Sequence, residues 1–430
     1  MQYVAKYCGI LIRIITAREV FMSIWSKNFI LLWQGQLISD FGNIIFNLSL
    51  GFWILDKFHN NLLIFGGIMA TLAIPRIILG SFGGSFADKH DRKKILITAD
   101  LIRGTLFTIA GLGIIFNFLT IYVIFVFGLI SGVCGAFITP AIASSVPDLV
   151  RVDDLAKANS ARNFGIALTQ LIGNSAGAVL YVAIGAPYVF LFTGIAFLYA
   201  SASQYFLRIP KHTHNIVKKD FFIEITEGLK FTMANKGLKK LVFTGMSINF
   251  FSFMGLFLLM PLFKENPLFG EIKYGLVMVS IMVGALLASV ALSVFKVKDK
   301  YRAAVTGSAL SMMIGGMIIA SLLNQFEIII VFAFFVGASN AVLNVMIQLV
   351  AQITVDAENR GKVFGVMSTV IEGLTPLAML LGVIIGSLIG SRQTIVGAFV
   401  MAGVCVLPPM LNKSFRTFIN SEPKQIEEGS

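Results

Sequence analysis

Charge is scarce in this sequence of 430 residues. Asp, Glu, Lys and Arg together make up 13% of the chain, whereas hydrophobic residues make up 57%. A chain so poor in charge does not have the composition of a soluble domain, so the sequence indicates a membrane protein. At about 20 apolar residues per spanning helix, the length allows about twelve helices with short loops and leaves no room for a sizeable soluble catalytic domain.

Several chemistries are excluded by what is missing. The cysteines Cys8, Cys134 and Cys405 are too few for a disulfide framework or a thiolate metal site. The four histidines form no His-Glu-x-x-His motif, so we expect no metal centre. A Gly-rich loop ending in Gly-Lys-Ser or Gly-Lys-Thr is also absent, which excludes ATP as an energy source within this chain. We therefore expect no cofactor and no enzyme activity.

Apolar runs divide the chain into two sets of six on either side of one polar insertion. The runs do not alternate apolar and polar residues as the strands of a barrel do, so we predict an all-α polytopic membrane protein with two six-helix bundles. The predicted spans lie near 28–55, 61–87, 95–117, 120–146, 158–182, 185–207, 241–263, 273–296, 303–323, 327–352, 364–391 and 393–412.

The polar segments complete the predicted organisation. Phe221 to Met233, within the insertion, has the pattern of an amphipathic surface helix. The N-terminal apolar stretch is too short to span, and an interfacial helix or a true start at Met22 would each explain it. We predict an N-terminal segment at 1–27, a bundle at 28–207, a central loop at 208–240, a second bundle at 241–412 and a tail at 413–430.

Lysines and arginines are distributed unevenly between the loops. Of the 34, 27 fall on the side that holds both termini and the central loop, four fall on the other side, and three lie inside spans. Because positively charged loops stay on the cytoplasmic side, both termini are predicted to be cytoplasmic, in the plasma (inner) membrane. Topology and attraction to the lipid bilayer thus explain the net charge of +12, and we expect no nucleic-acid partner.

The loop between the second and third spans carries a motif. It reads Gly84-Ser85-Phe86-Ala87-Asp88-Lys89-His90-Asp91-Arg92-Lys93-Lys94. This resembles the cytoplasmic loop motif of the major facilitator superfamily: Gly, three residues, Asp-Arg, two residues, then Arg and a further basic residue. The positions that match are Gly84, Asp88, Arg92 and Lys93. Lys89 replaces the usual Arg, and Asp91 replaces the usual Gly.

Other stretches are similar to the macrolide-efflux-type branch of that superfamily. They are Ile74-Pro75-Arg76, Ala99-Asp100-Leu101-Ile102-Arg103, Ala158-Asn159-Ser160 and Arg360-Gly361-Lys362-Val363-Phe364-Gly365. The resemblance covers about residues 28 to 412. It implies a proton-driven drug exporter that works by alternating access, and no obligate protein partner is evident. One departure is Asn174, in Gly173-Asn174-Ser175-Ala176-Gly177, where such antiporters usually have proline.

Ionisable residues at membrane depth are candidates for proton coupling. Asp40 lies near the middle of the first span, where a poorly solvated carboxylate could take up and release protons; permanent pairing with a basic group such as Arg76 is the alternative. Arg76 follows Pro75 and is either a structural residue of a hinge or a cavity charge. Glu372 in the eleventh span is either a second proton carrier or an acid that reaches toward the interface.

Amide side chains recur at helical spacing in several spans. Amides on one helix face could bind a polar ligand or could hold helices together. In the seventh span, an amide next to Phe250, Phe251 and Phe253 suits an amphipathic compound. The candidate cavity residues are Gln36, Asn43 and Asn47 in the first span, Asn163, Gln170 and Asn174 in the fifth, Asn249 in the seventh, and Asn340, Asn344 and Gln348 in the tenth.

The loop motif is predicted to form a cytoplasmic gate. Its charged residues could pair with each other or with acids on neighbouring spans, and those pairs would break when this side opens. A fixed loop that serves only topology is the alternative. The candidate gate residues are Gly84, Asp88, Arg92 and Lys93, extended by Asp100 and Arg103, which lie three apart on one helix face.

Together these features predict a transporter for a small-molecule substrate. We expect export of a small amphipathic organic compound, a macrolide-like drug or a metabolite, by exchange for protons. Export of a siderophore or other endogenous metabolite, or proton symport, is the alternative. A polytopic membrane enzyme or sensor is the alternative of another class.

Overall fold

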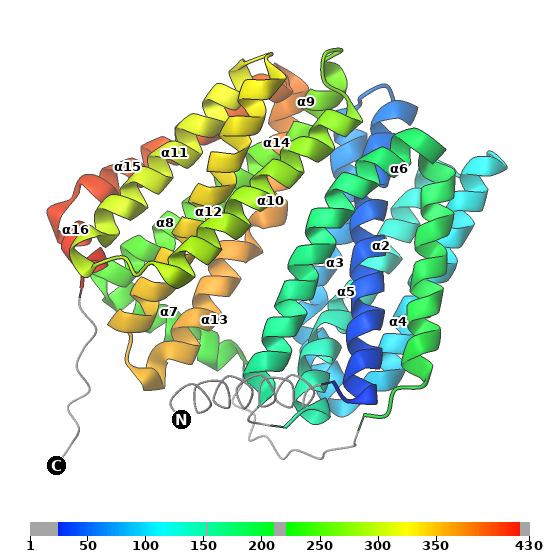
Figure 1. The fold of residues 1–430 in the computed structure, drawn as a ribbon, viewed down its shortest axis with the longest axis horizontal. Helices are drawn as coiled ribbons and strands as arrows, with labels where there is room; N and C mark the ends of the chain where they lie inside the picture. Colours follow the sequence, from blue (N-terminus) through cyan, green and yellow to red (C-terminus); the bar gives the residue numbers. More distant parts are fainter. Residues whose placement is uncertain (1–24, 152–153, 210–220, 422–430) are drawn as a thin grey trace, which may run out of the picture. The chain divides into compact units, whose positions relative to one another are not determined.

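The structure is a computed structural model that describes residues 25–151, 154–209 and 221–421. These residues form helices joined by short loops (Figure 1). The elements are α2 (Lys27–Lys57), α3 (Leu62–Lys89), α4 (Arg92–Ile115), α5 (Ile121–Leu149), α6 (Leu155–Tyr205), α7 (Phe221–Ala234), α8 (Lys236–Leu256), α9 (Leu259–Glu265), α10 (Glu271–Val294), the 3₁₀ turn η2 (Asp299–Tyr301), α11 (Arg302–Leu322), α12 (Phe326–Thr354), α13 (Ala357–Gly373), α14 (Thr375–Ile389), α15 (Ser391–Leu411) and α16 (Lys413–Ile419).

Helix length and hydropathy fit a membrane. In the described residues, 11 helical stretches are long and apolar enough to cross one. One of them, α6, has 51 residues, far more than a hydrocarbon core about 30 Å thick requires. It breaks at Gly185, where φ is 80°, a conformation that glycine adopts without steric cost. The break makes α6 two crossings, so the prediction of an all-α protein with twelve spans is confirmed.

Two compact units make up the chain. The first lies within Met1–Leu50 and Thr71–His214, and the second within Gly51–Ala70 and Asn215–Ser430. Residues 51–70, which were predicted in the first bundle, pack in the second unit.

Several contacts hold residues 51–70 in the second unit. The Phe65 ring stacks on Phe257 with ring centroids 4.9 Å apart. Lys264 Nζ lies 2.5 Å from Asp56 Oδ1 and also pairs with Glu271. The ends of α2 and α3 therefore belong, by packing, to the unit that the C-terminal helices form.

Small residues let α4 and α6 pack closely in the first unit (Figure 1). A Cβ atom on Gly104 would lie 2.9 Å from the backbone nitrogen of Leu198, and one on Gly111 would lie 2.8 Å from the carbonyl of Pro187. Such contacts with backbone atoms leave no room for a side chain. Close approach through glycine is a common way to pack helices where water gives no hydrophobic drive.

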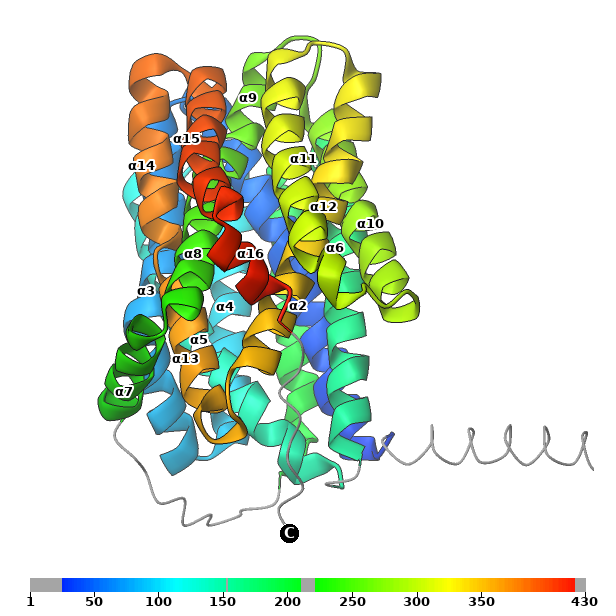
Figure 2. The same cartoon turned by 90° about the vertical axis from the view of Figure 1, so that its left-hand side faces the viewer.

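In the second unit, α10 packs on α12, and α8 packs on α14 and α15 (Figure 2). Gly284 of α10 faces the carbonyl of Phe334, and Gly337 of α12 faces the carbonyl of Ile281, so backbone meets backbone at both positions. A helix, α7, lies where the amphipathic surface helix was predicted, and it packs on α8 and α13.

Candidate functional site

A cavity of about 280 Å³ lies inside the first unit. Its charged lining residues come from four helices: Asp40 from α2, Arg76 from α3, Arg103 from α4 and Arg162 from α6. The full lining is Gln36, Asp40, Asn43, Ile44, Arg76, Arg103, Gly135, Ile138, Thr139, Ile142, Arg162, Ile166, Thr169 and Gln170.

Asp40 is the acid of this cavity. It interacts electrostatically with Arg103, Arg162 and Arg76, and the side chain of Gln36, one turn earlier on α2, hydrogen-bonds to it. Among the residues that the structure describes, no direct ion pair joins Asp40 to any of the three arginines. The carboxylate of Asp40 therefore lies among several cations, and its role in proton coupling or in charge pairing stays a prediction.

Glycines on α5 determine where Arg76 lies. A Cβ atom on Gly135 would lie 2.5 Å from Arg76 Nε, so the bare backbone of α5 makes room for the guanidinium. One turn earlier, a Cβ atom on Gly132 would lie 2.7 Å from the carbonyl oxygen of Thr71, which brings α5 close to α3. Pro75 lies inside α3 directly before Arg76 and removes one backbone N–H donor from the helix.

Arg103 is fixed by contacts with three helices. Its Nη2 donates a hydrogen bond to Asn43 Oδ1 at 2.9 Å, its Nη1 lies 3.9 Å from Asp100 Oδ1, and its guanidinium carbon lies 4.1 Å from the centre of the Phe197 ring. Only 5% of its surface is exposed. The side chain is therefore held by α2, α4 and α6 at the edge of the cavity.

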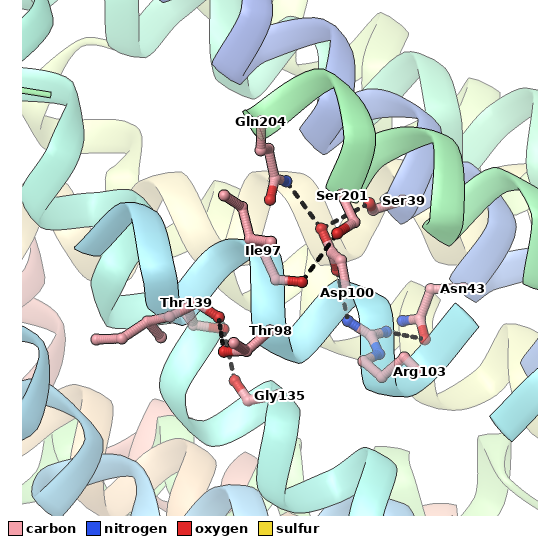
Figure 3. Close-up of polar contacts among 11 residues, drawn as sticks. Ser39, Asn43, Ile97, Thr98, Asp100, Arg103, Gly135, Thr139, Ser201 and Gln204 are labelled. Atoms are coloured by element: carbon pink, nitrogen blue, oxygen red, sulfur yellow. Dashed lines mark hydrogen bonds and ion pairs between the residues drawn. The ribbon is translucent and has the colours of Figure 1, made fainter. Parts of the chain in front are cut away.

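Asp100 lies behind Arg103 and is 2% exposed (Figure 3). Its Oδ2 accepts hydrogen bonds from Gln204 Nε2 at 2.8 Å and from Ser39 Oγ at 3.4 Å. The sequence grouped Asp100 and Arg103 with the loop motif; in the structure Arg103 lines the cavity and Asp100 contacts it from outside the lining. The i, i+3 spacing brings Asp100 and Arg103 together as predicted from the sequence. The hydrogen-bond donors to Asp100 come from α2 and α6.

The loop motif itself is held by two kinds of contact. Arg92 at the start of α4 forms an ion pair with Asp148 near the end of α5 and donates a 2.8 Å hydrogen bond to the carbonyl of Ser144. The Lys93 ammonium lies 5.2 Å from the centre of the Tyr205 ring. Arg92 thus pairs with an acid on a neighbouring span, and the role of the loop as a gate stays a prediction.

Asp91, the unexpected acid of the motif, caps α4. Its φ is −65°, which any residue can adopt, and its carboxylate accepts a 3.1 Å hydrogen bond from the backbone nitrogen of Lys93. An aspartate here satisfies a free N–H at the helix start, so the glycine usual at this position is not needed. Gly84 has open space around it, and the side chain of Asp88 lies outside the described part of the structure.

A second cavity, of about 470 Å³, is lined by residues of the second unit, and none of the described lining residues is charged. Four predicted amides line it: Asn249, Asn340, Asn344 and Gln348. The Thr375 hydroxyl donates a 3.0 Å hydrogen bond to Asn249 Oδ1, and Asn344 Nδ2 donates to Asn340 Oδ1 at 3.0 Å. The remaining lining residues are mainly apolar, so this cavity suits an uncharged, partly apolar group.

Several predicted residues lie away from both cavities. Asn47, Asn163 and Asn174 are absent from the lining; Asn174 Nδ2 instead donates a 2.8 Å hydrogen bond to the carbonyl of Gln170 on its own helix. Phe253 lines the second cavity, whereas Phe250 and Phe251 pack against Met254, Ala378 and Ala398. Glu372 belongs to α13, but its side chain lies outside the described part of the structure.

Sequence reasoning missed Arg162 as a cavity residue. Its only signal was its position as a lysine or arginine inside a span, which charge counting recorded without assigning a role. The threonines Thr139 and Thr169 of the lining gave no signal, because hydroxyls in apolar helices commonly bond to their own backbone, as both do here.

One segment has the spacing of a hydrolase nucleophile motif, Gly-x-Ser-x-Gly, at Gly173-Asn174-Ser175-Ala176-Gly177. That motif requires a sharp strand-to-helix turn. Here the segment lies inside α6, and Ser175 Oγ donates to the carbonyls of Leu171 and Ile172. Ser175 is thus an ordinary helical serine.

Twelve spans, with a cavity in each unit that polar side chains help to line, are typical of a membrane transporter for small molecules. A family model described as Major Facilitator Superfamily matches residues 32–375, and the chain belongs to that superfamily. It is accordingly a multi-pass membrane protein and a transporter, not an enzyme.

Relatives and solved structures agree with this class. Macrolide efflux protein A of Streptococcus pyogenes is 25% identical over 401 residues, which cover 90% of this chain and 97% of that protein. The staphyloferrin A transporter of Staphylococcus aureus is 27% identical over 160 residues, covering 37% of this chain and 40% of that one. The fold matches a bacterial homologue of the human lysosomal transporter Spinster with a TM-score of 0.66 at 14% identity, covering 93% of this chain and 99% of that one.

Proposed function

We propose that the chain exports a small amphipathic organic compound across the plasma membrane in exchange for protons. The observation that carries the proton part is Asp40, an acid that lines the first unit's cavity with no direct ion pair among the described residues. Export is supported by the similarity to macrolide efflux protein A over almost the whole of both chains.

Asp40 is proposed as the group that takes up and releases the proton. A carboxylate in a cavity can be protonated when the cavity is open to the more acidic side, and it can release the proton after the cavity has opened to the other side. The arginines around it stabilise the ionised form, so that release is possible at membrane depth. Glu372 is proposed as a second acid of this kind in the C-terminal half.

The loop side is proposed as the cytoplasmic side, with both termini on it, because the basic residues gather there. On this orientation, the Arg92–Asp148 pair between α4 and α5 is a cytoplasmic gate contact. The pair and the hydrogen bond to Ser144 would stabilise one state and break in another.

The cavity of the second unit, whose described lining residues carry no charge, supports the amphipathic character of the substrate. Four amides supply hydrogen-bond donors and acceptors, and Phe253, Leu256 and Met313 supply apolar contacts. A lining of this composition binds organic groups through apolar area and sets their orientation through the amides.

A second candidate is cotransport of a proton with an anion, and the three arginines favour it. Protonation of Asp40 removes a negative charge that attracts Arg76, Arg103 and Arg162, so proton and anion would bind together. Exchange requires instead that proton and substrate compete. The two candidates therefore differ in the direction of proton movement.

The test is proton movement in vesicles. Purified protein is reconstituted with a pH-sensitive dye inside, and either a labelled macrolide, for the exchange candidate, or citrate, for the anion candidate, is added outside. Exchange predicts that substrate entry drives protons out, and cotransport predicts that it drives protons in. In Asp40→Asn we expect substrate-driven proton movement to be lost.

The matched control is Glu327→Gln, which removes an exposed acid at the start of α12 outside both cavities. We expect this variant to move protons as the native chain does. Unchanged proton movement in Asp40→Asn would contradict the role of Asp40 and direct attention to Glu372.

A further inference from the structure

We infer that the cavity of the first unit is a binding site for an oxyanion, a carboxylate or a phosphate group of the transported compound. The inference rests on the proposed function only in that the chain moves a small molecule. It names the chemical class that the first unit recognises, and it agrees with the cotransport candidate, because protonation of Asp40 would strengthen anion binding.

The charge of the lining is the first argument. Three arginines and one aspartate line the cavity, which leaves a formal charge of +2. Asp100, the next acid, is outside the lining and is engaged by Gln204, Ser39 and Arg103. When Asp100 is counted as well, the formal charge is still +1. Uncompensated charge in a membrane span is costly. An anionic ligand would supply the negative charge that the described residues do not provide.

Unsatisfied donors are the second argument. The Nε atoms of Arg76, Arg103 and Arg162 are buried and find no hydrogen-bond acceptor among the described residues. Arg103 is 5% exposed, so its Nε is shielded from bulk water. Three buried guanidinium donors that border one cavity point to acceptors inside it, because a buried donor left without a partner costs free energy.

The shape and remaining lining favour an organic acid over a bare ion. Guanidinium groups bind carboxylate and phosphate through paired N–H donors in a planar fork. The volume of about 280 Å³ is near the lower end of ligand sites, which run from about 300 Å³. The amides of Gln36 and Gln170 add polar contacts, and the apolar lining that faces a carbon skeleton consists of Ile44, Ile138, Ile142 and Ile166.

Asp40 would compete with such an anion. Its carboxylate shares the cavity and attracts all three arginines. Replacing it with asparagine removes one negative charge and keeps the side chain's size, so the site should bind an anion more tightly.

The experiment measures binding by calorimetry with the purified full-length protein in detergent near neutral pH. The probes are citrate for a carboxylate, inorganic phosphate for a phosphate, glycerol as an uncharged control and tetraphenylphosphonium as a cation. We expect saturable binding of citrate or phosphate; which of the two binds decides between the two oxyanions.

Three variants locate the site. Arg162→Gln should bind the anion about tenfold more weakly, because one of three charged donors is removed. Asp40→Asn should bind it about tenfold more tightly. Arg151→Gln is the matched control, since Arg151 is an exposed arginine of the same unit outside the cavity, and its affinity should not change. Monodispersity and thermal unfolding show that each variant is folded.

Two results would overturn the inference. One is the absence of saturable binding of both anions by the native protein, and the other is equal anion affinity in the native protein and Arg162→Gln. Calorimetry measures anion binding without a proton gradient. Its result therefore tests the anion site independently of the proposed proton exchange. A protein that binds citrate and moves no protons contradicts proton exchange and leaves the anion site intact.

Discussion

Asp100 shows how a buried acid is stabilised inside a membrane span. Its carboxylate accepts two hydrogen bonds and lies 3.9 Å from the guanidinium of Arg103, which stacks on Phe197 in turn. Each of these groups would be costly to bury alone. Together they form a network in which the position of Arg103 at the cavity depends on Asp100.

The first prediction removes that acid. Asp100→Ala should lower the free energy of unfolding by about 3–5 kcal/mol, because it leaves Arg103 buried without its acidic partner. The measurement is unfolding in detergent, followed by circular dichroism. Replacing the exposed Glu327 with alanine, at the start of α12, should have a much smaller effect. Equal losses in the two variants would mean that Arg103 does not depend on Asp100.

The second prediction concerns the room that Gly135 makes. Gly135→Ala places a methyl group 2.5 Å from Arg76 Nε, and because the neighbour is a flexible side chain, the guanidinium should move and the helices should stay in place. We expect an unchanged unfolding midpoint and anion affinity lowered by about tenfold, from displacement of one charged donor. The control is Gly80→Ala on α3, which has open space around it.

At the scale of elements, glycines set which helices approach most closely. On α10 and α12, Gly284 and Gly337 each face a backbone carbonyl of the other helix, so neither position has space for a Cβ atom. Backbone cannot rotate away as a side chain can. These two helices are therefore held at a distance that only glycine allows.

The third prediction compares two glycines of the second unit. Gly337→Ala should destabilise the protein by about 1–3 kcal/mol, because α10 and α12 must separate. Gly315→Ala on α11, where nothing lies within 4 Å, should be neutral or slightly stabilising. Thermal unfolding of both variants in the same detergent measures the difference. Unchanged stability of Gly337→Ala would contradict the close approach of α10 and α12.

Most elements were predictable because their signals are local. Apolar length and loop charge lie in the sequence itself, and the predicted gap between 182 and 185 coincides with the break at Gly185. The site was less predictable, because helical spacing identifies a face and not what that face contacts. Gln36, Asp40 and Asn43 share a face and line one cavity, but Asn47 at the same spacing lies beyond it. Arg162 joins them only through tertiary packing.

At the scale of the whole molecule, orientation rests on loop charge. The fourth prediction is therefore a labelling pattern in a variant without native cysteines. Leu268→Cys, in the exposed loop between α9 and α10, should react with an impermeant maleimide in intact cells. Lys298→Cys, between α10 and α11, should react only after the cells are permeabilised. The reverse pattern would place both termini outside.

The three arginines of the first unit also have an electrical consequence. The cavity has a formal charge of +2 when empty and close to zero when it holds a dianion. A charge that crosses the full membrane field gains or loses about 2.3 kcal/mol per 100 mV. Membrane voltage would therefore affect reorientation of the empty protein more than reorientation of the loaded protein. A more negative cell interior would favour the state in which the empty, positively charged cavity faces the cytoplasm.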